Sequence, residues 1–396
     1  MPRRVFITVA EVSGDLHASH LIHSLRSLDP ELIIEGHGGP QMRAAGAKIH
    51  TETTANAAMG FSALARVKEM FALLKWTRRH FRAAPPDLQI CVDSPALNFH
   101  FAKAAHAVKT PVLYYVAPQL WAWREGRMKK VRKWVDKVAC ILPFEEAYFR
   151  SHGVDTTFVG HPLFDELKQP AGEAKPVRDF GDAPIVGLLA GSRRSEAARN
   201  FPRMLEVAAA IRGRFAGARF LLPTTAATDP IVRGQVAALA EGSPFEIRQG
   251  AFDEFVPRCD LVLTVSGTAT LHVALHNTPM IVVYYGRPLT WNAVGRWLIK
   301  TRTYALVNLL AAEPELASSG RVTPAMHIVP EFIPWYGSTQ PVAEHAISLL
   351  SDPTKLADQR ERLAALARKL ERPGASMAVA RMAVEMMNKA VMEGSP

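Results

Sequence analysis

Apolar and polar positions alternate along this chain in a pattern typical of an α/β protein. In the first half, the short apolar runs at residues 5–10, 87–92 and 112–116 are each followed by a turn or a stretch with helical spacing. The pattern restarts with apolar runs at residues 185–189, 220–223, 245–248 and 260–265. Because strands that alternate with helices form parallel sheets, each half is predicted to be a parallel-sheet α/β domain.

A stretch rich in proline, glycine and charge, residues 168–184, separates the two halves and predicts a linker. The predicted domains are therefore residues 1–168 and 185–340. The last stretch, residues 341–396, is helical and polar with stripes of alanine, leucine and methionine, which favours packing over chemistry. At 396 residues the chain is long enough for two or three cores.

Residues 260–285 predict one strand–turn–helix–strand unit, and its turn is Ser266-Gly267-Thr268. Free N–H groups at a helix N-terminus suit a phosphate, although an ordinary capped helix has the same pattern. A second turn, Gly191-Ser192-Arg193, follows the run at 185–189, and its arginine can clamp a phosphate. Two such turns in one domain favour nucleotide binding. Neither a Walker loop nor a GxGxxG site is present.

Asp93 ends the predicted strand at residues 87–92. A carboxylate at the carboxyl end of a parallel strand points into the crevice where such sheets bind ligands. Two hypotheses stay open from the residues alone. Asp93 is a general base that deprotonates an alcohol, or it caps a helix near residues 98–108.

Residues 59–82 form a basic amphipathic stretch. Leu64, Val67, Phe71 and Leu74 recur at helical spacing, and six basic residues lie between and after them. One interpretation is a surface helix that covers the sheet. The other is a membrane-surface contact in which Met59, Phe61 and Trp76 enter the headgroup layer.

The formal net charge of +10 and pI of about 9.6 favour an anionic partner. A basic run follows Trp121 and Trp123, but no nucleic-acid-binding module is recognisable, so a phosphorylated substrate or an anionic lipid explains the charge better. The three cysteines are far apart and fit reduced core thiols. No apolar run is long enough to span a membrane and no signal peptide is recognisable, which predicts a cytoplasmic protein.

Several motifs together resemble a known family. They include EVSGDLHAS at 11–19, GHGGPQMRAAG at 36–46, VDSP at 92–95, PQLWAWREGRMKKV at 118–131, LPFE at 142–145, FVGHPL at 158–163, LAGSR at 189–193, SGTATL at 266–271, NLLA at 308–311 and VPEF at 329–332. In their order and in the specific PQLWAWR stretch, they resemble the lipid-A-disaccharide synthases, bacterial glycosyltransferases of the GT-B fold. The resemblance covers nearly the whole chain.

The resemblance implies two Rossmann-like domains facing each other across a cleft, with C-terminal helices that cross back to the first domain. It also implies an inverting reaction. UDP-2,3-diacylglucosamine donates its sugar to the 6-hydroxyl of 2,3-diacylglucosamine 1-phosphate (lipid X), giving a β(1→6) disaccharide 1-phosphate and UDP. The family uses no metal or other cofactor, and no nucleic-acid partner is expected. The acyl chains of both substrates imply a peripheral enzyme on the cytoplasmic face of the inner membrane.

The matching motifs also imply roles for individual residues. Asp93 corresponds to the proposed catalytic base. The implied donor-binding residues are Gly191, Ser192, Arg193, Ser266, Gly267, Thr268 and His272. The implied acceptor or cleft residues are Glu11, Ser13, Gly14, Asp15, Trp123 and Arg124. The implied membrane contacts are Met59, Phe61, Lys75, Trp76, Arg78 and Arg79.

Four residues depart from the family pattern: Ala10, Ala96, His272 and Pro334. His272 stands where an acidic residue usually follows SGTATL, and an imidazole cannot make the bidentate hydrogen bond of a carboxylate to ribose. Two alternatives therefore stay open. One is a UDP-sugar transferase or epimerase with a different acceptor, and the other is a UDP-binding homologue with weakened catalysis.

Overall fold

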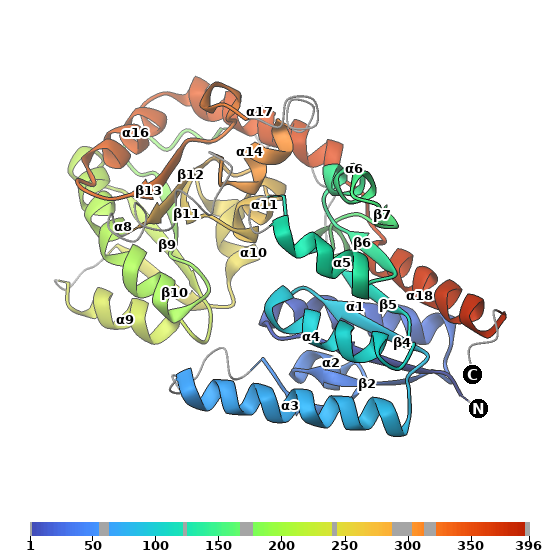
Figure 1. The fold of residues 1–396 in the computed structure, drawn as a ribbon. Helices are drawn as coiled ribbons and strands as arrows, with labels where there is room; N and C mark the ends of the chain where they lie inside the picture. The colour runs from blue at the N-terminus through green and yellow to red at the C-terminus, as the bar shows by residue number, and fades with distance from the viewer. Residues whose placement is uncertain are drawn as a thin grey trace. The chain divides into compact units, whose positions relative to one another are not determined.

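The computed structural model describes residues 2–54, 63–121, 125–166, 177–239, 244–286, 303–312 and 322–392. Two compact units divide the chain (Figure 1). Unit 1 comprises residues 1–166 and 372–396, and unit 2 comprises residues 167–371. Each unit contains a parallel sheet with helices packed on it, which confirms the predicted pair of Rossmann-like α/β domains.

The sheet of unit 1 has seven strands in the order β3-β2-β1-β4-β5-β6-β7. The strands are β1 (Arg4–Thr8), β2 (Ile33–Gly38), β3 (Lys48–Glu52), β4 (Leu88–Val92), β5 (Val112–Tyr115), β6 (Lys137–Cys140) and β7 (Thr156–Phe158). The helices are α1 (Val12–Leu28), α2 (Pro40–Ala44), α3 (Ala63–Ala83), α4 (Pro95–His106), α5 (Met128–Trp134), α6 (Pro143–Ser151), α7 (Leu163–Glu166) and α18 (Ala375–Met392).

Strand β1 shows why this sheet is buried on both faces. Its side chains alternate, so Val5 and Ile7 enter one apolar cluster and Phe6 enters the cluster on the opposite face. Residues of α1 and α18 complete the first cluster, and residues of α4 contribute to the second. A central strand of a parallel sheet covered on both faces needs a continuous apolar run, and this strand supplies one.

The start of helix α18 is capped by a residue of unit 1 that lies far from it in the sequence. The carboxylate of Asp165 accepts hydrogen bonds from the backbone N–H groups of Gly374, Ala375 and Ser376 at 2.6, 3.3 and 3.0 Å. Val379, Ala383 and Met387 of the helix are fully buried against the first apolar cluster. Asp165 therefore satisfies the free N–H groups of the helix start and fixes where the helix begins.

The sheet of unit 2 has six strands in the order β10-β9-β8-β11-β12-β13. The strands are β8 (Ile185–Leu189), β9 (Arg219–Thr224), β10 (Phe245–Gln249), β11 (Leu261–Val265), β12 (Met280–Tyr285) and β13 (Glu331–Trp335). The helices are α8 (Arg194–Arg214), α9 (Asp229–Ala237), α10 (Phe252–Phe255), α11 (Thr268–Leu275), α14 (Leu306–Ala311), α16 (Gln340–Leu350) and α17 (Pro353–Leu370).

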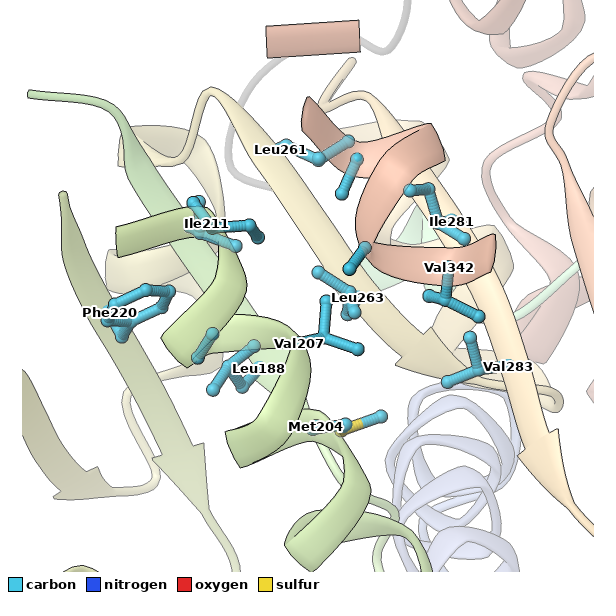
Figure 2. Packing of buried hydrophobic residues seen from close by; sticks show 14 of the residues in the cluster. Leu188, Met204, Val207, Ile211, Phe220, Leu261, Leu263, Ile281, Val283 and Val342 are labelled. Carbon is cyan, nitrogen blue, oxygen red and sulfur yellow. The ribbon is translucent and has the colours of Figure 1, made fainter. Parts of the chain in front are cut away.

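The core of unit 2 joins its sheet to helices α8 and α16. Leu188 and Leu263 of neighbouring strands lie beside Met204 and Val207 of α8, and Val342 of α16 closes the cluster (Figure 2). Helix α17 packs on α11 and α14 in the same unit. The expectation that all of residues 341–396 would pack back on the first domain is therefore corrected: α16 and α17 bury their apolar faces in unit 2, and only α18 joins unit 1.

Candidate functional site

Both sheets reverse their strand order at a point that the sequence motifs mark. In unit 1 the reversal lies between β1 and β4, and in unit 2 it lies between β8 and β11. Open α/β sheets bind ligands outside the carboxyl ends of the strands at such a switch point. The segments that follow these four strands contain Glu11, Asp93, Gly191 and Ser266, all predicted site residues.

Asp93 and Ser94 lie on an unusual backbone bend after β4. Both have left-handed conformations, with φ of 50° and 46°, and Pro95 then begins α4. Two successive non-glycine residues with positive φ are strained, and such strain persists where the surroundings fix it, often at functional sites. Ser94 occupies the N-cap position of α4, so the hypothesis that Asp93 caps this helix is wrong.

Buried side chains fix the bend. The Nδ2 of Asn98 donates to the carbonyl oxygens of Val92 and Asp93, at 2.9 and 2.6 Å. The Tyr114 hydroxyl donates to the Asp93 carbonyl at 2.7 Å, and the Thr8 hydroxyl donates to Asn98 Oδ1 at 2.7 Å. Asn98, Tyr114 and Thr8 have no exposed surface. Asn98 is thus a positioning residue that the sequence analysis missed, although it follows the VDSP motif by three residues.

The start of α1 lies close to this bend. A Cβ atom on Gly14 would meet Val9 Cγ1 at 2.7 Å and would lie 3.9 Å from the Cβ of Asp93. Only glycine therefore allows this close approach of α1 without displacing Val9. Glu11 is the N-cap residue of α1 and Ser13 is exposed in its first turn, so both lie at the same sheet edge as Asp93.

Asp15 has a structural task at this edge. Its buried carboxylate accepts hydrogen bonds from the backbone N–H groups of Gly39, Gln41 and Met42, at 2.8, 2.9 and 3.2 Å. These are N–H groups at the start of α2, which has no cap of its own from its N-cap residue. The structure therefore assigns Asp15 to holding α2 rather than to contacting an acceptor.

In unit 2 the switch point is formed by two glycine turns on paired strands. Leu189 of β8 pairs with Thr264 of β11, so the turns that follow lie side by side. Gly191 has a φ of +110° and Gly267 has a φ of +147°. Within the described parts of the chain, a Cβ atom on Gly267 would meet nothing within 4 Å, and no side chain caps α11 at this residue. The first turn of α11 is therefore open to an anionic ligand.

Arg193 and Ser192 lie beside the first of these turns. Arg193 is the N-cap residue of α8, its side chain is 60% exposed, and its Nη1 is 3.2 Å from Glu196 Oε1. Ser192 is exposed, and its carbonyl accepts a hydrogen bond from the Thr225 hydroxyl at 3.2 Å. An exposed surface ion pair of this kind is weak, and a guanidinium can bind a phosphate through two parallel hydrogen bonds.

Hydrogen bonds support the second turn through Tyr304 and through two residues of the quoted motifs, Asn308 and Glu331. The Ser266 hydroxyl donates to the carbonyl of Tyr304 at 2.8 Å. Glu331 accepts from the backbone N–H of Tyr304 at 2.9 Å and from Asn308 Nδ2 at 2.7 Å. The Ser266 side chain is thus directed to the protein, and the backbone of Gly267 and Thr268 forms the open part of the turn.

His272 lies one turn further along α11. Its Nε2 is 2.8 Å from Asp253 Oδ1, and its ring stacks on Phe252 with the ring centroids 4.3 Å apart. His276 Nε2 is 2.9 Å from the same oxygen. Hydrogen bonds from these imidazoles, with His272 the larger contributor, hold the pKa of Asp253 well below its usual range. The residue that departs from the family pattern is therefore engaged by a carboxylate.

Helix α3 exposes a basic face. Lys75, Arg78 and Arg79 are all exposed, as predicted for a surface contact. Phe71 is 64% exposed, whereas Leu74 is buried, so of these two apolar residues only Leu74 belongs to the inner face of the helix. No helix in the described parts of the chain is both long and apolar enough to cross a membrane.

Trp76 is only partly available for a membrane contact. It is 39% exposed, and its ring stacks on His80 with centroids 4.7 Å apart. His80 and His50 both contact the carboxylate of Glu35, as does Arg4. Burial alone would raise the pKa of Glu35, but these hydrogen bonds outweigh it and lower the pKa to about 2. Met59, Phe61, Trp123 and Arg124 lie outside the described residues.

Solved structures agree with the fold. The UDP-GlcNAc 2-epimerase from Neisseria meningitidis bound to UDP-GlcNAc is 12% identical with a TM-score of 0.63, and the alignment covers 97% of this chain and 100% of that one. Acinetobacter baumannii MurG is 13% identical with a TM-score of 0.53, covering 97% and 100%. Two Rossmann-like units of this kind define the GT-B class of glycosyltransferases and related epimerases.

Sequence relatives narrow that class. A family model described as lipid-A-disaccharide synthetase matches residues 5–384. The lipid-A-disaccharide synthase of Geobacter metallireducens is 36% identical over 392 residues, which is 98% of each chain. The chain belongs to the lipid-A-disaccharide synthase family and is a glycosyltransferase that forms a disaccharide. The resemblance inferred from the motifs is thereby confirmed.

Proposed function

We propose that this enzyme transfers 2,3-diacylglucosamine from UDP-2,3-diacylglucosamine to the 6-hydroxyl of 2,3-diacylglucosamine 1-phosphate (lipid X). The products are the β(1→6)-linked disaccharide 1-phosphate and UDP. One observation carries the proposal. In a family that forms disaccharides, a carboxylate at the switch point of unit 1, Asp93, lies on a strained bend that buried side chains hold in place.

Asp93 acts as the general base in this proposal. The 6-hydroxyl oxygen of the acceptor attacks the anomeric carbon of the donor from the face opposite UDP, which inverts the configuration. Its proton passes to the Asp93 carboxylate as the new C–O bond forms. The bond between the anomeric carbon and the diphosphate oxygen breaks, and UDP leaves with the electron pair.

The switch point of unit 2 binds the donor diphosphate. The open first turn of α11 at Gly267 and Thr268 offers backbone N–H groups and the positive end of a helix dipole. The turn at Gly191 and Ser192 presents Arg193, whose guanidinium stabilises the negative charge that develops on departing UDP. His272, four residues along α11 from this turn, offers one hydrogen bond to the ribose in this proposal. Glu11, Ser13 and Gly14 line the acceptor side.

Turnover with the two named substrates tests this proposal. Wild-type enzyme is expected to form UDP and one disaccharide 1-phosphate, and NMR of the product is expected to show the β configuration and a 6-linkage. Acceptors that lack the 1-phosphate or the acyl chains are expected to react poorly. If UDP binds but no disaccharide appears, while His272→Glu restores turnover, the departure at residue 272 has disabled the donor site and the proposed activity is wrong for the wild type.

The exposed basic face of α3 supports a peripheral attachment to the cytoplasmic surface of the inner membrane. Each Lys or Arg near an anionic surface contributes about 1 kcal/mol, so reversing Lys75, Arg78 and Arg79 to glutamate should weaken binding to anionic vesicles about 100-fold or more. Arg212, Arg214 and Arg219 of unit 2 are equally exposed and provide the matched control. Equal losses in both triple variants would contradict a specific role of α3.

A further inference from the structure

Two imidazoles and one carboxylate converge on the surface of unit 2. His272 lies in α11, and His276, four residues later, is the C-cap residue of this helix, so the two side chains lie one turn apart on the same side. Asp253 comes from the short helix α10, and its Oδ1 is 2.8 Å from His272 Nε2 and 2.9 Å from His276 Nε2. One ligand atom from each residue lies within 4.8 Å of the other two.

The surroundings hold these side chains in place while leaving the ligand atoms accessible. The rings of His272 and His276 are nearly parallel, with centroids 5.3 Å apart, and Phe252 stacks on the ring of His272. Phe255 anchors α10 with no exposed surface. The two histidine side chains are 19% and 16% exposed and the Asp253 side chain is 70% exposed, so an ion can enter from solvent.

We propose that Asp253, His272 and His276 bind a divalent transition metal ion of the zinc type. Imidazole nitrogens favour zinc, cobalt, nickel or copper over magnesium and calcium, which prefer oxygen ligands. Zinc bonds of about 2.0–2.2 Å in a tetrahedral site place the ligand atoms roughly 3.3 Å apart. Each nitrogen–oxygen distance then has to open by only about half an ångström, a movement that the exposed Asp253 side chain allows.

A second cluster shows why this one is favoured. Glu35, His50 and His80 in unit 1 also bring three ligand atoms together. There, however, Glu35 is buried and already paired with the guanidinium of Arg4, whose charge opposes a cation. Asp253 instead is paired with two imidazoles, which bind a metal ion as neutral ligands once they are deprotonated. This site shares His272 with the proposed donor site, whereas Asp253 and His276 have no role in the proposed transfer reaction and can be varied separately.

Titration with Co²⁺ tests the site directly, because cobalt bound by two imidazoles and a carboxylate has visible absorption bands. The wild type is expected to bind one Co²⁺ that Zn²⁺ displaces. His276→Ala and Asp253→Asn are each expected to weaken binding about 100-fold, since each removes one of three ligands. His345→Gln, at another half-buried histidine of unit 2, is expected to bind like the wild type.

Thermal unfolding distinguishes lost ligands from lost folding. Zn²⁺ is expected to raise the melting temperature of unit 2 in the wild type, because a ligand that binds only the folded state stabilises it. Asp253→Asn, at a largely exposed residue, is expected to melt like the metal-free wild type and to show no rise with Zn²⁺. Absence of a Co²⁺ spectrum in the wild type, or an unchanged spectrum in Asp253→Asn, would overturn the proposal.

Discussion

The two switch points have the same topology but are built from different parts of the chain. At the edge of unit 1, buried side chains do the positioning: Asn98 and Tyr114 hold the backbone of Asp93 in a left-handed bend. At the edge of unit 2 the backbone has this role, because Gly191 and Gly267 both have positive φ and Gly267 gives α11 an N-cap residue without a side chain. One edge therefore presents a carboxylate, whereas the other presents N–H donors suited to an anion.

Sheet topology determines where a ligand can bind, and the residues at each switch point determine which chemistry is possible there. The strand order reverses in both sheets, and in both the segments that follow the two central strands meet. A proton acceptor requires a side chain held at a defined position, and in unit 1 buried polar groups hold it. A diphosphate requires several donors at once, which open helix termini supply without side chains.

The largest expected effect is a difference between the two units in their stability at acid pH. Burial lowers the pKa of His17 to about 4 and that of His37 to about 3, from an ordinary value of 6.5. No described histidine of unit 2 is buried. Because these folded-state pKa values lie below the unfolded ones, the stabilisation is complete above about pH 6.5 and decreases as the pH falls below that value. It is fully lost below about pH 4 for His17 and below about pH 3 for His37. For His17 alone it amounts to about 3 kcal/mol.

Hydrogen exchange during urea unfolding, compared near pH 7 and near pH 4.5, measures this effect in both units of one molecule. Unit 1 is expected to lose protection at lower urea in acid, while unit 2 changes less. The substitution His17→Gln removes a side chain that takes up a proton on unfolding, so it is expected to reduce the difference between the two units in their loss of protection. Parallel loss of protection in both units, with or without the substitution, would contradict the account.

The next effect concerns the positioning of Asp93. Asn98→Ala removes the donor to the carbonyls of Val92 and Asp93, which are then left without this partner. The bend is expected to relax, and a misplacement of about 1 Å costs roughly 100-fold in kcat. The affinity for UDP is expected to stay the same. The exposed Asn388 provides a matched control as Asn388→Ala, and normal kcat in Asn98→Ala would refute its positioning role.

The smallest effect concerns the backbone turn of unit 2. Gly267 has φ of +147° and ψ of −164°, a region that only glycine adopts readily. Gly267→Ala should cost about 1–3 kcal/mol of strain in the turn, and we expect the affinity for UDP to fall about 10-fold. Calorimetric titration with UDP measures this change in affinity. Gly213→Ala in α8, where a Cβ atom also meets nothing within 4 Å, should bind UDP normally.

Local patterns in the sequence predicted much of this organisation. The predicted strand at residues 260–265 agrees with β11 to within one residue, and α11 begins at the last residue of the predicted turn, because an apolar run, a glycine and helical spacing are all short-range signals. Asp93 was placed correctly at the end of β4 for the same reason. These signals were enough to locate both switch points.

Contacts between distant residues could not be predicted in this way. Asp165 caps a helix that begins more than 200 residues later, and Asp15 caps α2 rather than facing a ligand. Glu331 and Asn308 brace the turn at Ser266 through hydrogen bonds across the fold. A carboxylate has the same sequence signature whether it binds substrate or caps a helix, and only the partner N–H groups distinguish the two.

The most direct test of the account is to measure kcat and the dissociation constant of UDP on the same preparation of Asp93→Asn. Asparagine keeps the shape of the side chain but cannot accept the acceptor proton, so kcat is expected to fall at least about 100-fold. The UDP dissociation constant is expected to stay within about twofold of the wild-type value, since the proposed diphosphate site belongs to unit 2. Asp155→Asn, at an exposed aspartate of unit 1, is the control. Wild-type kcat in Asp93→Asn, or a loss of UDP affinity as large as the loss of kcat, would contradict the division of chemistry between the two switch points.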